Sequence, residues 1–392
     1  MSDAMRDNAI RDNAMRVTGE STIHDLGYRR YEGARVGATG AWGALFRQGF
    51  RAMFGLGRPA KAKAVAAFVC AASTLPMLGQ VSAASMSQGM MSIRLGGFVA
   101  PNIILFALFV AAQAPEVLSR DQQHRVLPLI LTRDVSRFSY ASARFCAIFA
   151  ALFLVALCPL LLYFLGEIGI SADPAKQFSE TGWKFWPVLA QAGLTASAIG
   201  GMAAALASWT PRRAFATAAI IGVFLVTTAA GQIVQEMSGD ARRVRVDAAL
   251  IAREAARSPA ERAEALKADS IRSAAFRRPG PSVVETGPQT AADSTRAAAR
   301  KARRLLPDSI VTVVEDSVMR GESGRERSMR RIGEIMSPPM AFETQAMLFF
   351  GETTRRMERL VPIPLWQYAL YHLGLGLVGA LLLALRIWRV RA

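Results

Sequence analysis

Residues 145–166 read FCAIFAALFLVALCPLLLYFLG, an uninterrupted apolar run with no Asp, Glu, Lys or Arg. A helix needs about 20 apolar residues to cross the hydrocarbon core of a bilayer. This run of 22 residues meets that length, so it predicts a membrane-spanning helix.

Five further windows lack charged residues, although such residues make up 20% of the chain. The longest charge-free run elsewhere, 36–46, has only 11 residues and is too short to cross. The pattern predicts an all-α, polytopic membrane protein with about six transmembrane helices. The five additional windows are 64–93, 95–115, 185–211, 214–235 and 360–385.

The formal net charge of +17 suits either a nucleic acid or an anionic membrane surface. Because the chain has six apolar windows, we attribute the positive charge to contact with a membrane surface. We therefore expect no nucleic-acid partner. The three cysteines lie inside apolar runs without disulfide or metal-ligand spacing, and we expect small buried side chains. They are Cys70, Cys146 and Cys158.

Glycines recur in the fourth and sixth windows at Gly200–Gly201, Gly374, Gly376 and Gly379. Small residues let membrane helices approach closely. We therefore interpret these glycines as packing positions and not as a substrate site.

The basic residues of the short connections predict the orientation, because loops rich in Lys and Arg stay in the cytoplasm. If all six windows cross, the N-terminal segment, the connection 116–144, the pair Arg212–Arg213 and the C-terminal tail fall on one side. The opposite short loops hold only Arg94, Lys176 and Lys184. Both termini are predicted to be cytoplasmic. One alternative stays open, because a re-entrant window 214–235 would put residues 236–359 in the cytoplasm.

The long segment between the last two windows is rich in Ala, Arg and Glu over 241–278 and 291–306, which favours helices. The stretches 279–290 and 321–331 are rich in Gly, Pro or Ser and predict loops. The expected divisions are a polar cytoplasmic N-terminal segment 1–40, an amphipathic elbow helix 41–60, five spans in 61–235, a long extracytoplasmic, helical and partly disordered segment 236–362, and span six with the cytoplasmic tail in 363–392.

Residues 41–56 carry apolar side chains at helical spacing, with basic residues on another face. A basic amphipathic helix of this kind lies in the membrane interface, and the alternative is an ordinary surface helix. The aromatic positions are Trp42, Phe46, Phe50 and Phe54, and the basic positions are Arg47 and Arg51.

The connection 116–144 has a charged stretch, then an apolar patch that includes Leu127 and Leu129, then a second basic stretch. Apolar residues rimmed by arginine suit a docking surface for another protein. An amphipathic segment tucked under the bundle is the alternative. We find no phosphate-binding loop, nucleophile elbow or metalloprotease motif in the chain, so we expect no enzymatic activity and no bound cofactor.

The run from Ala114 to Arg144 resembles the loop between spans two and three of type-2 ABC transporter permeases. The resemblance rests on Ala114-Pro115-Glu116, Asp121, Leu127-Pro128-Leu129, Leu131-Thr132-Arg133, Val135-Ser136-Arg137, Tyr140 and Arg144. One departure is Asp134, where that family usually has proline. The segment 41–56 is similar to the family's elbow helix, and 336–359 to its extracellular portion. Roughly 237–332 looks like an insertion that the resemblance does not cover.

The resemblance implies the permease subunit of an ATP-binding-cassette exporter in a bacterial inner membrane. Such a subunit pairs with a second permease copy or paralogue and with cytoplasmic ATPase subunits that hold ATP and Mg. It leaves the exported substrate undefined. If the resemblance holds for its function, the loop within Ala114–Arg144 would be the coupling segment that contacts the ATPase. The candidate residues are Asp121, His124, Arg125, Leu127, Leu129, Arg133 and Arg137.

Two other functions remain at this point. One is a permease-like membrane scaffold or sensor without transport. The other is a membrane-embedded lipid-modifying enzyme, which would need catalytic polar groups near the interface, and the sequence offers no such set. The absence of Asp, Glu, Lys and Arg from the windows argues against an ion-coupled carrier.

Overall fold

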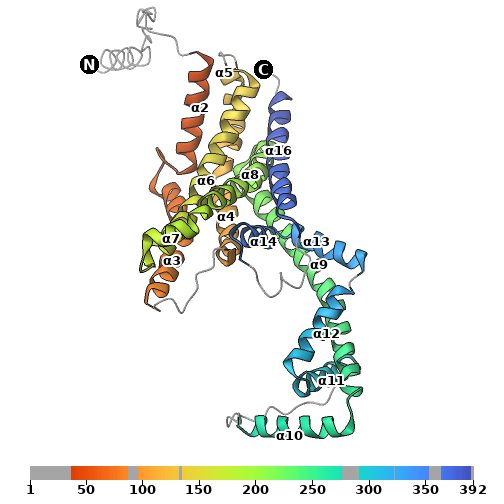
Figure 1. The fold of residues 1–392 in the computed structure, drawn as a ribbon. Coiled ribbons are helices and arrows are strands. Elements are labelled where there is room, and N and C mark those ends of the chain that lie inside the picture. The colour runs from red at the N-terminus through yellow and green to blue at the C-terminus, as the bar shows by residue number, and fades with distance from the viewer. Residues whose placement is uncertain are drawn as a thin grey trace, which may run out of the picture. The chain divides into compact units, whose positions relative to one another are not determined.

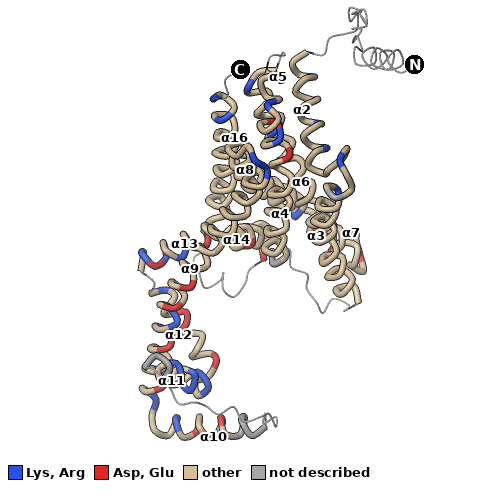
Figure 2. Tube along the Cα trace, turned by 180° about the vertical axis from the view of Figure 1, so that it is seen from behind, with Lys and Arg blue, Asp and Glu red and all other residues tan. Residues whose placement is uncertain are grey.

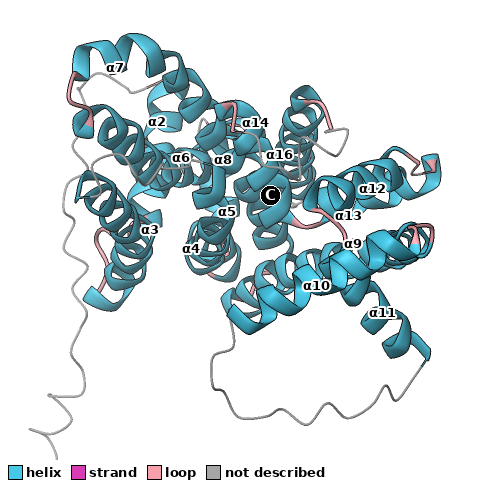
Figure 3. Ribbon diagram, turned by 60° about the horizontal axis from the view of Figure 1, so that its bottom comes forward, coloured by secondary structure: helices cyan, strands magenta, loops and turns pink. Residues whose placement is uncertain are grey.

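The computed structural model describes residues 37–86, 96–131, 135–275, 291–321, 323–352 and 363–389. The chain divides into two units at Gly37, and every described helix lies in the second unit, Ala38–Ala392. Only helices and their connections occur in these described ranges, as Figure 3 shows. The predicted loop 279–290 and the positions Arg133 and Asp134 lie outside them.

Six helices are long and apolar enough to cross a membrane, which confirms the predicted all-α polytopic architecture. Each of the six charge-free windows falls largely within one of these helices. They are α3 (Ala60–Met86), α4 (Gly96–Gln123), α6 (Arg137–Ile170), α8 (Phe185–Trp209), α9 (Arg213–Ala255) and α16 (Leu365–Trp388), shown in Figure 1.

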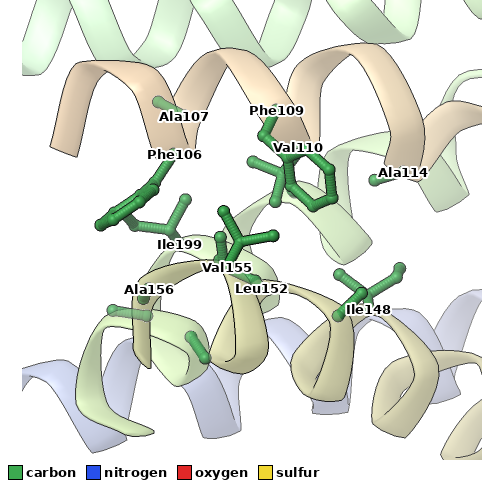
Figure 4. Close-up of a cluster of buried hydrophobic side chains, with 14 of the residues drawn as sticks. Phe106, Ala107, Phe109, Val110, Ala114, Ile148, Leu152, Val155, Ala156 and Ile199 are labelled. Carbon is green, nitrogen blue, oxygen red and sulfur yellow. The ribbon is translucent and has the colours of Figure 1, made fainter. Parts of the chain in front are cut away.

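The core of the bundle lies where α4, α6 and α8 meet. Figure 4 shows Phe106 and Val110 of α4 facing Leu152 and Val155 of α6, with Ile199 of α8 beside them. These side chains are buried, whereas α3, α9 and α16 present many apolar residues outward. An outward apolar face suits lipid or another membrane protein.

The predicted glycine packing is confirmed between α8 and α16. A methyl group on Gly201 would lie 2.7 Å from Cα of Gly376, and one on Gly379 would overlap the backbone carbonyl of Gly201. Gly374 is different, because it has open space around its Cα. Two of the glycines on α16 therefore allow backbone contact with α8, and the third does not.

One end of the bundle, which we call the α5 end, gathers the ends of several spans. Ser119 of α4 donates a hydrogen bond to the Ala207 carbonyl of α8 at 2.9 Å. Gln122 of α4 and Arg386 of α16 both donate to the Ser208 carbonyl. The short helix α5 (Val126–Leu131) follows α4 at this end.

The opposite end, the α14 end, is covered by α7 (Pro174–Thr181), a 3₁₀ turn (Gly182–Lys184) and α14 (Pro338–Phe350). Helix α14 packs against α4 and α8. Gln191 near the start of α8 donates to the Phe342 carbonyl of α14, and the ring of Phe342 stacks on His372 of α16. Residues 338–350, within the part that resembles the family's extracellular portion, thus form a packed helix.

Helix α9 continues for 43 residues without a break, well past the apolar window 214–235. That window therefore does not turn back within the membrane. The far half of α9 packs with α11 (Ala291–Leu305) and α12 (Asp308–Arg320) around a small core of Leu250, Leu306 and Val311. Helix α10 (Pro259–Ala275) follows α9 in the chain and contacts α11.

The stretch 321–331 was predicted to be a loop, and from Gly324 onward that prediction is wrong. Helix α13 (Gly324–Met336) begins there with a capping box, in which Ser323 and Glu326 satisfy each other's backbone N–H groups. Arg245 of α9 lies 2.9 Å from Glu326 and helps to hold α13 against α9. The capping box outweighs the glycines that favoured a loop.

Two other expectations are corrected. The connection between spans two and three is shorter than 116–144, because α4 continues to Gln123 and α6 already begins at Arg137. The cysteines are not fully buried. Cys158 is exposed, and Cys70 and Cys146 are half-buried, all as free thiols.

Candidate functional site

The end of α4 carries a buried carboxylate, Glu116, whose side chain is only 6% exposed. Arg58, in the turn before α3, lies 3.1 Å from it. Arg213, the first residue of α9, pairs with its other oxygen, and Arg120 approaches at 3.9 Å. A carboxylate removed from water needs such compensation. Glu116 thereby links the starts of α3 and α9 to α4.

Charge is retained at this site despite burial. Burial lowers the pKa of the Arg58 guanidinium, and the nearby Glu116 carboxylate opposes that shift. An arginine side chain starts from a pKa so high that it stays protonated in proteins. Arg58 therefore keeps its positive charge beside the Glu116 carboxylate.

A second carboxylate, Asp121, lies one turn further along α4. Its Oδ2 accepts hydrogen bonds from Arg144 Nη2 at 2.6 Å and from the Tyr140 hydroxyl at 2.7 Å. The Arg144 side chain is 2% exposed and also donates to Gln48 Oε1 at 3.2 Å. Asp121 and Arg144 therefore join α4, α6 and the helix α2 (Ala38–Met53).

Helix α2 is the predicted amphipathic helix, and it packs on α6. Trp42 donates to the Ser142 hydroxyl at 3.0 Å, and a methyl group on Gly49 would lie 2.8 Å from Cβ of Ala147. The chain leaves α2 through a turn in which Gly55 and Gly57 have positive φ angles. The four predicted aromatics of α2 contact one another in sequence: Trp42 stacks on Phe46 and Phe46 on Phe50, whereas the rings of Phe50 and Phe54 are tilted. Phe54 in turn contacts Phe109 of α4.

Helix α2 and the end of α4 enclose a groove of about 900 Å³, which we call the basic groove. Basic residues gather at this end of the bundle in Figure 2. Two apolar residues of α2, Phe46 and Phe50, also line it. Its charged lining residues are Arg47, Arg51, Arg58, Arg120, Arg144, Glu116 and Asp121, and His124 also lines it.

The predicted coupling residues fall into an inward and an outward group. Asp121 is held by Arg144, and Leu127 is 2% exposed and packs in the main core. Leu129, in contrast, is 62% exposed, and His124 and Arg125 are also exposed. Leu127 therefore anchors α5, and Leu129 is presented outward.

Arg137 and Arg133 differ from the rest of the set. Arg137, at the start of α6, donates to the Trp388 carbonyl at the end of α16. It therefore connects two spans. Arg133 lies outside the described residues, so its place in the coupling segment stays a prediction from the sequence.

Sequence reasoning missed the role of Glu116 as a centre of ion pairs. Its spacing from Arg120 is a local signal, because residues four apart share one helix face. The pairs with Arg58 and Arg213 have no local signal, since they join distant segments.

The arrangement presents charged side chains that are suited to binding a ligand. The described residues hold no group of His, Cys, Asp and Glu that could bind a metal ion. Both carboxylates of the basic groove are already paired with arginine. The groove therefore presents cations and apolar side chains, a set that binds anions.

The chain matches no known protein-family model, and neither a curated protein nor a solved structure shows significant similarity to it.

Proposed function

We propose that the chain is the membrane-spanning subunit of an ATP-binding-cassette exporter, driven by separate cytoplasmic ATPase subunits. The supporting observation is α5, a helix of six residues set at the end of the long helix α4. Leu127 fixes α5 to the core while Leu129 faces outward. A small helix held in this way can transmit a movement of the ATPase subunit directly to α4, the second span.

Other features agree with this proposal. Six apolar helices supply the membrane part, and α2 packs beside them as an elbow helix would. The segment from Ala114 to Arg144 carries the resemblance to type-2 ABC permeases. A second copy or a paralogue would complete the path, and the exposed apolar faces of α3, α9 and α16 suit that contact.

The same proposal assigns the α5 end to the cytoplasm of a bacterial cell. Arg58, Arg120 and Arg213 meet there on Glu116, and Arg386 also lies at this end. Such a concentration of arginine next to the spans favours the cytoplasmic side. Both termini then lie in the cytoplasm.

Replacing Leu129 with Asp is expected to reduce copurification of the ATPase subunit at least about fivefold, because loss of an apolar interface anchor that contributes about 1 kcal/mol weakens binding by that factor. The measurement is affinity purification of the tagged permease from membranes, with quantification of the bound ATPase. Leu266→Asp is the matched control, since Leu266 is an exposed leucine on α10.

Equal ATPase recovery with Leu129→Asp and the control would remove α5 from the coupling interface. If the unmodified chain recovers no ATPase at all, the scaffold or sensor function replaces the exporter. Leu127→Asp is not an informative test of docking, because it places a charge in the core.

The orientation has its own test, by cysteine labelling in a variant without the three native cysteines. A cysteine in place of His124 is expected to react only with a reagent that reaches the cytoplasm. A cysteine in place of Arg253, near the far end of α9, is expected to react with an impermeant reagent in intact cells. The reverse pattern would invert the topology and exclude cytoplasmic coupling through α5.

A further inference from the structure

We propose that the basic groove binds the phosphate headgroup of an anionic phospholipid, with the lipid's apolar part against Phe46 and Phe50 of α2. This inference goes beyond the exporter proposal, because it holds for a transporter, a scaffold or a sensor alike. It assigns a ligand class to a groove whose residues carry no catalytic set.

The charge of the groove is the first argument. Five arginines and two carboxylates line it, which leaves three positive charges in excess. Glu116 is held by Arg58, and Asp121 by Arg144. The excess therefore resides mainly in the other three, Arg47, Arg51 and Arg120.

The three remaining guanidinium groups are accessible. The Arg47 and Arg51 side chains are exposed on α2. The Arg120 side chain is 57% exposed, and its contact with Glu116 is long at 3.9 Å. A planar guanidinium matches the oxygen geometry of a phosphate and binds it through two N–H groups at once.

The position and the apolar lining favour a lipid over a free anion. The charge-free window of α4 ends at Pro115, so the arginines begin where the hydrocarbon core gives way to headgroups. Phe46, Phe50 and Val117 share the groove with the arginines. A free phosphate would use only the cations, whereas a phospholipid uses both kinds of surface.

The size of the groove agrees with this occupant. A volume of about 900 Å³ lies in the range of small-molecule sites. It accommodates a headgroup with the first part of its chains. Because α2 supplies one wall and α4 the other, a bound lipid would also bridge the elbow helix and span two.

The experiment uses the full chain, purified in a neutral detergent and titrated with a short-chain phosphatidylglycerol. Native mass spectrometry gives the stoichiometry, and a parallel titration with the matching phosphatidylcholine gives the headgroup preference. We expect one phosphatidylglycerol per chain and an affinity at least about tenfold above that for phosphatidylcholine, because basic residues at a membrane surface each strengthen anionic-lipid binding about fivefold.

The triple variant Arg47→Gln, Arg51→Gln and Arg120→Gln is expected to lose that preference. Its matched control removes the same charge from α11, by Arg300→Gln, Lys301→Gln and Arg304→Gln. These control residues are exposed and lie far along the chain from the groove. The control is expected to bind phosphatidylglycerol within about twofold of the parent, because it leaves the groove intact. Size-exclusion profiles confirm that both variants are folded.

Three outcomes would overturn the assignment. Equal lipid preference in the triple variant and the control would show that the lipid binds elsewhere on the chain. Competition by inorganic phosphate at the same concentration as the lipid would make the groove a free-phosphate site. Unchanged lipid binding together with loss of a copurifying cytoplasmic protein would make it a protein-docking face.

Discussion

Replacing Gly379 with alanine is expected to separate α8 from α16 and to remove most of the folded protein. The new methyl group would overlap the Gly201 carbonyl, which is backbone and cannot rotate away. Overpacking usually costs about 1–3 kcal/mol, and an obstacle of backbone atoms puts this site at or above the upper end. The measurement is the yield and apparent Tm of the purified protein, followed by size-exclusion chromatography.

The control for this substitution lies on the same helix. Gly374→Ala meets no atom within 4 Å and improves helix propensity, so its yield should equal or exceed that of the parent. Equal loss in the two variants would contradict direct backbone contact between α8 and α16. An unchanged yield and Tm in both variants would also contradict that contact.

Replacing Arg144 with leucine is expected to cost about 3–5 kcal/mol of unfolding free energy, the usual effect of removing one partner from a buried ion pair. The Arg144 side chain is almost fully buried, and its loss leaves Asp121 without its cation and Gln48 without its donor. The measurement is denaturant unfolding in detergent. Because α2, α4 and α6 meet at this pair, the whole α5 end should loosen.

The comparison is Arg243→Leu, which breaks the exposed pair of Arg243 and Asp240. An exposed pair contributes only about 0–1 kcal/mol, so a similar cost for the two variants would refute the structural role of Arg144. A double variant, Arg144→Leu with Asp121→Leu, should lose less than the sum of its single variants, since it leaves no buried charge unpaired.

The spans themselves were predictable, because length and absence of charge suffice to define a helix in a membrane. The ends of the spans were not. Glu116, Arg120 and Arg144 looked like loop residues by their charge, yet they lie in helices. Glu116 is balanced by Arg58 and Arg213, which are distant in sequence, and Arg144 is balanced by Asp121. A charged residue ends an apolar window in the sequence. In the structure the helix continues past that residue when its charge is paired.

The binding surface was predictable only in part. The apolar patch with Leu127 and Leu129 was visible in the sequence, but which leucine faces outward depends on how α5 is seated. The basic groove requires α2 to lie beside α4, a tertiary contact without any sequence signature. The capping box at Ser323 and Glu326, in contrast, was present in the sequence and should have indicated α13.

Helix α9 makes a mechanical connection through the bilayer. Its 43 residues extend about 64 Å at 1.5 Å per residue, whereas the hydrocarbon core is about 30 Å thick. It starts at the ion pair of Arg213 with Glu116 and ends among α11 and α12. Because α9 is a single unbroken helix, a tilt at its arginine end would also displace its far end, where α11 and α12 pack.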